Sequence, residues 1–184
     1  MINTVRVLLQ ANKQIFLPAV VKGPGNLQKF LARNMSSASS FVLREIDGDL
    51  FSAPKEYSLA HCVGADMAMG AGIAVKFRQI YQQVDELLDQ NVSTGGAAVL
   101  KDEDRFIYYL VTKQYSYEKP TYDSLRSSLI DMRNHMIQND IKKLAIPKIG
   151  CGIDGLEWDK VQAELKKVFE KENVEITVYN FVPK

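Results

Sequence analysis

The sequence feature that most constrains the fold is a glycine-rich turn, Ile149–Gly155, that follows the short apolar run Leu144–Ile146. In α/β proteins, a strand, a glycine-rich turn and an amphipathic helix in this order build phosphate sites, because glycine lets the backbone approach an anion and the helix start offers free N–H groups. Asp154 within the turn would repel a phosphate. It either caps the helix that begins near Trp158 or has a chemical role, and a second loop favours the chemical role.

That second loop is the Met69–Ala74 stretch, with the sequence Met-Gly-Ala-Gly-Ile-Ala. It opens a predicted helix from about Gly72 to Asn91, whose apolar residues recur at helical spacing: Ile73, Phe77, Ile80, Val84, Leu87 and Leu88. Alone this loop is a weak signal, but two such loops predict a ligand with two phosphates held between them. The chain has neither G-x-x-x-x-G-K-[ST] nor G-x-G-x-x-G, which argues against a P-loop NTPase or a dinucleotide-binding dehydrogenase.

The composition limits the classes of protein and site. The 184 residues, 46% of them hydrophobic, are enough for one domain, and no apolar run approaches the roughly 18 residues that cross a bilayer. The two cysteines, Cys62 and Cys151, form no C-x-x-C, so free thiols in a reducing compartment are expected. Cys151 could be a nucleophile, but a buried thiol is the better interpretation. With only His61 and His135, we expect no metal site and no cofactor.

Charge divides the chain into two parts. Residues 1–44 hold six basic residues and no acidic one, so residues 45–184 hold all 22 acidic residues against 17 of the 23 basic ones, a formal net charge of −5. An acidic body argues against direct nucleic-acid binding. We expect no membrane association.

Residues 1–40 are predicted to be a basic leader outside the fold, followed by one domain at 41–184. The leader is acid-free and serine-rich near its end, the composition of a mitochondrial transit peptide, although a disordered basic tail is the alternative. A start at Met35 would leave only Met-Ser-Ser-Ala-Ser-Ser before the domain. We therefore expect an intracellular protein with a long mitochondrial form and a short nuclear or cytosolic form.

The body predicts an α/β fold: a mixed central sheet covered by helices on both faces. Strands are expected at 41–46, 59–63, 97–101, 105–112, 144–146 and 175–180, and further helices from Pro120 to Met136 and from Trp158 to Phe169. Ligands of such sheets bind beyond the carboxyl ends of the strands. Lys113 follows the strand 105–112, so it is expected at that edge together with the two glycine loops.

These residues resemble a known family. From Arg44 to Phe181 the chain is similar to the macrodomain branch of terminal ADP-ribose protein glycohydrolases. The matching stretches are Gly48–Phe51, Ser58–Cys62, Met69–Ala74, Ile107–Lys113, Lys119–Tyr122, Pro147–Asp154 and Ile176–Tyr179. Other macrodomain branches usually carry Asn-Ala-Ala-Asn where this chain has Ala60-His61-Cys62, which supports the assignment to this branch.

The resemblance implies a macrodomain-like fold, a deep cleft for ADP-ribose, Lys113 as nucleophile and Asp154 as acid/base. The implied ligand contacts, which include residues of both glycine loops, are Asp49, Leu50, Gly64, Gly70, Ala71, Gly72, Ile73, Lys148, Ile149, Gly150, Cys151, Gly152, Ile153 and Phe181. Asp49 and Leu50 would lie at the adenosine end, and Lys148–Asp154 at the diphosphate and distal ribose. The family pattern has a serine at the position of Gly64.

The implied activity is release of ADP-ribose from protein Glu or Asp, with O-acetyl-ADP-ribose deacylation as a related reaction. The partners would be ADP-ribose and ADP-ribosylated proteins, and the protein a monomer. Lysine forms Schiff bases with carbonyls, so it suits an anomeric carbon that can open to an aldehyde. Removal from water favours the neutral amine of Lys113, whereas an ionised Asp154 favours the ammonium, and the sequence leaves this balance open. The alternative function is an ADP-ribose reader, which would not need the Lys113/Asp154 pair.

Overall fold

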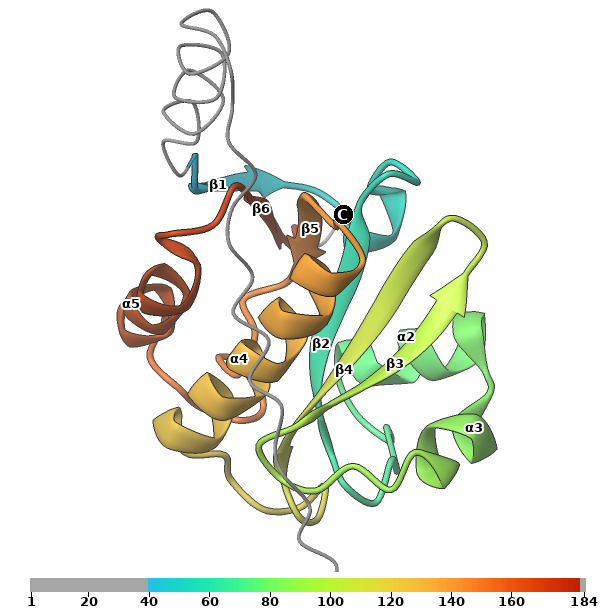
Figure 1. Ribbon diagram of the computed structural model, residues 1–184. Helices are drawn as coiled ribbons and strands as arrows, with labels where there is room; N and C mark the ends of the chain where they lie inside the picture. Colours follow the sequence, from blue (N-terminus) through green and yellow to red (C-terminus); the bar gives the residue numbers. More distant parts are fainter. Residues whose placement is uncertain (1–39, 183–184) are drawn as a thin grey trace, which may run out of the picture. The chain divides into compact units, whose positions relative to one another are not determined.

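The computed structural model describes residues 40–182 of the chain (Figure 1). The predicted leader, residues 1–40, lies outside the described residues except for its last residue. The elements are β1 (Val42–Asp47), the short 3-10 helix η1 (Leu50–Ser52), β2 (Ser58–Gly64), α2 (Ile73–Tyr81), α3 (Val84–Asp89), β3 (Ala97–Asp102), β4 (Arg105–Lys113), α4 (Tyr122–Gln138), β5 (Lys143–Ile146), α5 (Trp158–Phe169) and β6 (Glu175–Asn180).

The strands of the described region form one mixed sheet in the order β1-β6-β5-β2-β4-β3. All neighbouring pairs are parallel except β3 and β4, which form an antiparallel hairpin. The carboxyl ends of β1, β6, β5, β2 and β4 therefore meet at one edge of the sheet. This edge receives the loops in which the sequence places the ligand site.

Helices cover both faces of the sheet, as predicted (Figure 1). Successive side chains of β4 point to opposite faces, so Tyr109 packs with α2 and α3 while Tyr108 packs with α4 and α5. β2 behaves in the same way and is buried along nearly its whole length. Burial on both faces explains why β2 and β4 read as continuous apolar runs in the sequence.

The predicted single helix from Gly72 to Asn91 is wrong. It is two helices, α2 and α3, separated by Gln82 and Gln83, whose φ angles of 52° and 42° are left-handed. The apolar spacing runs through the break, so the sequence pattern hides it. The consequence is visible in burial, because Ile80 and Leu88, which one continuous helix would turn to the core, are 47% and 45% exposed.

The start of α4 is set by local hydrogen bonds beside the end of β4. Thr121 is the N-cap, and its hydroxyl accepts a hydrogen bond from Ser124 N at 3.0 Å while Ser124 Oγ accepts one from Thr121 N at 3.1 Å. Ser124 Oγ also donates to the Thr112 carbonyl at 2.7 Å. These bonds tie the helix start to the residue before Lys113 and confirm the predicted helix beginning.

Candidate active site

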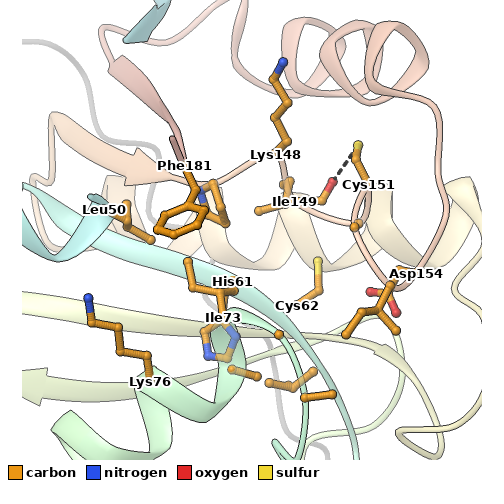
Figure 2. A pocket seen from close by; sticks show the side chains of 18 of the residues that line it. Leu50, His61, Cys62, Ile73, Lys76, Lys148, Ile149, Cys151, Asp154 and Phe181 are labelled. Atoms are coloured by element: carbon orange, nitrogen blue, oxygen red, sulfur yellow. Dashed lines mark hydrogen bonds between the residues drawn. The ribbon is translucent and has the colours of Figure 1, made fainter. Parts of the chain in front are cut away.

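One cleft of about 850 Å³ lies at the carboxyl edge of the sheet. Every residue that the sequence assigned to the site lines it: Asp49, Leu50, Gly64, Gly70, Ala71, Gly72, Ile73, Lys113, Lys148, Ile149, Gly150, Cys151, Gly152, Ile153, Asp154 and Phe181. Figure 2 shows part of this lining, including Leu50, Ile73 and Asp154. They come from the ends of five parallel strands and from the start of α2. The structure thus brings the predicted residues together, while their roles in binding and catalysis stay predictions.

The two glycine loops approach each other at the cleft. A Cβ placed on Gly72 would lie 3.2 Å from Ile153 Cδ1, so the Met69–Ala74 loop can approach the Ile149–Gly155 loop this closely only without a side chain there. Gly72, the N-cap of α2, also has a left-handed φ of 59°. In the Ile149–Gly155 loop, Gly150 has a φ of 70° and its carbonyl accepts from Leu156 N at 2.8 Å. Glycine is needed at both positions for these backbone angles.

Lys113 and Asp154 form an ion pair at one end of the cleft. Lys113 Nζ lies 2.5 Å from Asp154 Oδ1, and the two side chains are 9% and 14% exposed. The alternative role of Asp154 as a helix cap is wrong, because Glu157 is the N-cap of α5. A lysine at the end of β4 and an aspartate from a loop 41 residues further on therefore converge in a nearly dry position.

Gly64 is tightly enclosed by the loop that follows Lys113. A Cβ on Gly64 would lie 2.8 Å from the backbone nitrogen of Ser116 and 2.7 Å from Asp66 Oδ1. Asp66 Oδ2 in turn accepts a hydrogen bond from Ser116 N at 2.9 Å. The space that a serine side chain would take at position 64 is thus filled by this loop. The loop also brings Ser116 to the cleft wall.

The opposite end of the cleft contains a second lysine–aspartate pair. Asp49 Oδ2 lies 2.7 Å from Lys76 Nζ on α2, and Asp49 Oδ1 accepts from Phe51 N at 3.0 Å. The hydrogen bonds from Lys76 and from this backbone N–H hold the pKa of the Asp49 carboxyl below its ordinary value. Both side chains are about half exposed, at 50% and 48%. Nearby Phe181 is 79% exposed at the rim.

Comparison with known proteins identifies the family. The family model described as Macro domain matches residues 60–165. This chain belongs to the Macro domain family. The macrodomain is 48% identical over 134 residues to the human protein named ADP-ribose glycohydrolase OARD1, an alignment that covers 73% of this chain and 88% of that protein. The family resemblance seen in the sequence motifs is therefore confirmed.

Relatives from bacteria agree with this assignment. A Thermus aquaticus protein named DNA ADP-ribosyl glycohydrolase is 26% identical over 148 residues, covering 75% of this chain and 41% of that protein. The solved structure titled "Macrodomain of Thermus aquaticus DarG" superimposes with a TM-score of 0.68 at 25% identity, covering 76% of this chain and 99% of that one. The predicted macrodomain-like α/β fold is confirmed.

Several residues that line the macrodomain cleft were not assigned to the site from sequence. Lys76 lies one helical turn after Ile73, and its charge in the otherwise apolar first turn of α2 was the available signal. Ser116 carries no sequence signal, because its place depends on packing against Gly64. His61 lies in the middle of the buried strand β2, three residues before Gly64.

His61 is an uncharged part of the cleft floor. It is fully buried and stacks on Phe77 with ring centroids 3.8 Å apart. Neither ring nitrogen has a hydrogen-bond partner within the described part of the chain. Burial lowers the pKa of His61 to about 3, so the ring is neutral near pH 7.

The two thiols of the cleft are not activated. Burial raises the pKa of Cys62 to about 12 and that of Cys151 to about 11, so both remain protonated near neutral pH. The sulfur of Cys151 donates to the Ile149 carbonyl at 3.3 Å (Figure 2). A cysteine acts as a nucleophile in its thiolate form, so this environment agrees with the interpretation of Cys151 as a buried thiol.

Lys148 contributes to the cleft mainly through its backbone. Its ammonium extends away from the other labelled side chains (Figure 2) and lies 3.4 Å from Glu45 Oε2. Within residues 40–182, no group of three or more His, Cys, Asp or Glu residues is arranged to hold a metal ion. No helix in this range is long and apolar enough to cross a membrane.

Proposed function

We propose that this macrodomain is a hydrolase, an ADP-ribose glycohydrolase that releases ADP-ribose from Glu or Asp side chains of proteins. The observation that carries the proposal is the Lys113–Asp154 ion pair, 2.5 Å long and nearly dry, in a cleft whose volume of about 850 Å³ suits a dinucleotide-sized ligand. A reader of ADP-ribose has no need for a lysine and an aspartate in direct contact. The name of the human relative, ADP-ribose glycohydrolase, supports the same activity.

In the first half of the proposed reaction, Asp154 takes a proton from Lys113 and the neutral amine attacks the anomeric carbon of the distal ribose. The bond from this carbon to the ester oxygen breaks, and its electron pair leaves with the substrate carboxylate. Asp154 then loses its proton to solvent. The contact of 2.5 Å between Nζ and Oδ1 allows the proton to move directly between the two groups.

In the second half, one N–H proton passes to the ring oxygen, the ribose ring opens, and the Lys113 nitrogen forms a Schiff base with the former anomeric carbon. Asp154 takes a proton from a water that adds to this carbon. It returns that proton to the nitrogen, the carbon–nitrogen bond breaks as the aldehyde forms, and Asp154 passes the hydroxyl proton to the released amine, which restores the Lys113 ammonium. The products are free ADP-ribose and unmodified Lys113.

The test is release of ADP-ribose from a protein that carries mono-ADP-ribose on a glutamate. Lys113→Ala and Asp154→Ala should each lower the rate by at least about a thousandfold, while ADP-ribose affinity measured by calorimetry stays within about tenfold of the parent. Lys171→Ala is the matched control, because Lys171 is exposed and precedes β6, at the opposite end of the sheet. Reduction with cyanoborohydride should attach ADP-ribose to the parent and not to Lys113→Ala.

Two results would contradict the proposal in different ways. Tight binding of ADP-ribose without release by the parent would make the protein a reader. Near-parental activity of either variant would remove the role assigned to that residue. Running the same assay with O-acetyl-ADP-ribose tests whether the pair also cleaves this ester, which presents the same ligand to the cleft.

A further inference from the structure

A lysine outside the cleft lining, Lys119, contacts the loop that carries Asp154. Lys119 Nζ donates a hydrogen bond to the carbonyl oxygen of Ile153, the residue directly before Asp154. No carboxylate within residues 40–182 forms an ion pair with Lys119, and its ammonium contacts this carbonyl instead. Lys119 is exposed and lies between β4 and α4, two residues before the helix cap Thr121.

The backbone that presents Lys119 is held from both sides. On one side, the carboxylate of Glu118 accepts hydrogen bonds from Gln114 N and Tyr115 N, both at 3.1 Å. On the other side, Pro120 restricts φ and Thr121 begins the capping box of α4. Lys119 therefore extends from a fixed base, and a long side chain on such a base can hold a distant carbonyl in place.

The contacted carbonyl has a direct geometric relation to the catalytic pair. The carbonyl of Ile153 lies in the same rigid peptide plane as the nitrogen and Cα of Asp154. Fixing the direction of this carbonyl therefore fixes the plane from which the Asp154 side chain projects. The Ile153 side chain is 62% exposed, so burial does not supply this restraint. The Cδ1 end of the Ile153 side chain lies close to Gly72, so Ile153 is also where the two glycine loops approach each other.

We propose that Lys119 is a positioning residue for the glycohydrolase reaction. It holds the Ile153–Asp154 peptide so that the Asp154 carboxylate meets Lys113, and it does not itself touch the ligand. This inference rests on the proposed function of Lys113 and Asp154. A displacement of about 1 Å in a catalytic group lowers a rate by up to about a hundredfold, which sets the size of the expected effect.

The experiment compares three variants in the ADP-ribose release assay. Lys119→Met keeps most of the aliphatic length and removes the ammonium, and should lower kcat by about ten- to a hundredfold with KM within about threefold. Lys119→Arg keeps a donor cation and should recover kcat to within about fivefold of the parent. Lys171→Met removes the same charge far from the cleft and should leave both constants unchanged.

A second readout does not depend on activity. A crystal structure of Lys119→Met should show Asp154 Oδ1 beyond hydrogen-bond distance of Lys113 Nζ. Parental kcat in Lys119→Met, an equal loss in Lys171→Met, or an intact Lys113–Asp154 contact in that crystal would each overturn the inference. A loss of ADP-ribose affinity that matches the loss of kcat would also overturn it, since Lys119 would then be a binding residue. An inactive parent would contradict the proposed function instead, and the crystal structure would still decide whether Lys119 positions Asp154.

Discussion

The cleft has a lysine–aspartate pair at each end, and the two pairs differ in environment rather than in chemistry. Lys113–Asp154 is 2.5 Å long with side chains 9% and 14% exposed, whereas Lys76–Asp49 is 2.7 Å long with side chains 48% and 50% exposed. Water screens the second pair, and exposed pairs contribute only about 0–1 kcal/mol to stability. The first pair excludes most water, so loss of either partner leaves a charge without compensation.

From this difference in environment we expect the two pairs to have different functions. An exposed pair can exchange its partner at small cost, so Asp49 can release Lys76 when a ligand group arrives. A nearly dry pair keeps its geometry and allows proton transfer without competing water. The comparison predicts that chemistry depends on the Lys113–Asp154 end, while the Asp49–Lys76 end affects affinity alone.

The largest expected difference is in turnover between two matched variants. Asp154→Asn should lower kcat by about a thousandfold, because an amide cannot accept the proton of Lys113. Asp49→Asn should leave kcat within about threefold and raise KM by up to about tenfold. Steady-state kinetics of ADP-ribose release measures both. Equal losses of kcat in the two variants would contradict the predicted difference between the two lysine–aspartate pairs.

The next effect is a pH dependence of stability at the cleft floor. His61 has a pKa of about 3 in the folded protein and an ordinary value near 6.5 when unfolded, so only the unfolded chain takes up this proton as the pH falls below 6.5. Stability should therefore decrease on acidification, by about 2 kcal/mol between pH 6.5 and 4.5. Urea unfolding across this range should show a smaller decrease for His61→Leu. Identical slopes in the variant and the parent would contradict this assignment.

An effect of similar size is expected from the packing beside Lys113. Gly64→Ala places a Cβ 2.8 Å from Ser116 N and should destabilise the protein by about 1–3 kcal/mol and lower activity by displacing the loop after Lys113. Gly70→Ala is the control for stability alone, because nothing lies within 4 Å of its Cβ position although Gly70 lines the cleft. Thermal unfolding should separate the two variants, and a Gly64→Ala protein with the stability and activity of the parent would contradict this prediction.

The smallest effect is expected at the exposed pair. Lys76→Met should change the free energy of unfolding by less than about 1 kcal/mol, since both partners of the pair are half exposed. Its kcat should equal that of the parent. Chemical unfolding and kinetics at low and moderate salt check this, and a loss of kcat would contradict the prediction that this end of the cleft affects affinity alone.

Most of the fold and the position of the cleft could be predicted from the sequence. The strands β2 and β4 are continuous apolar runs because both of their faces are buried, and the glycine loops mark where strand ends meet helices. The break between α2 and α3 could not be predicted, because the apolar spacing continues through Gln82 and Gln83. A helical pattern of apolar residues shows which side chains can share a face, but it does not show where the helix is interrupted.

The sequence by itself determined which residues reach the carboxyl edge of the sheet, because strand ends and glycine turns are local properties of the chain. Only the tertiary structure decided which of them touch. The contacts of Lys113 with Asp154, of Lys76 with Asp49 and of Lys119 with the Ile153 carbonyl join residues 27 to 41 positions apart. Such contacts depend on how separate elements pack on one sheet, and no local pattern encodes the distance between two side chains from different loops.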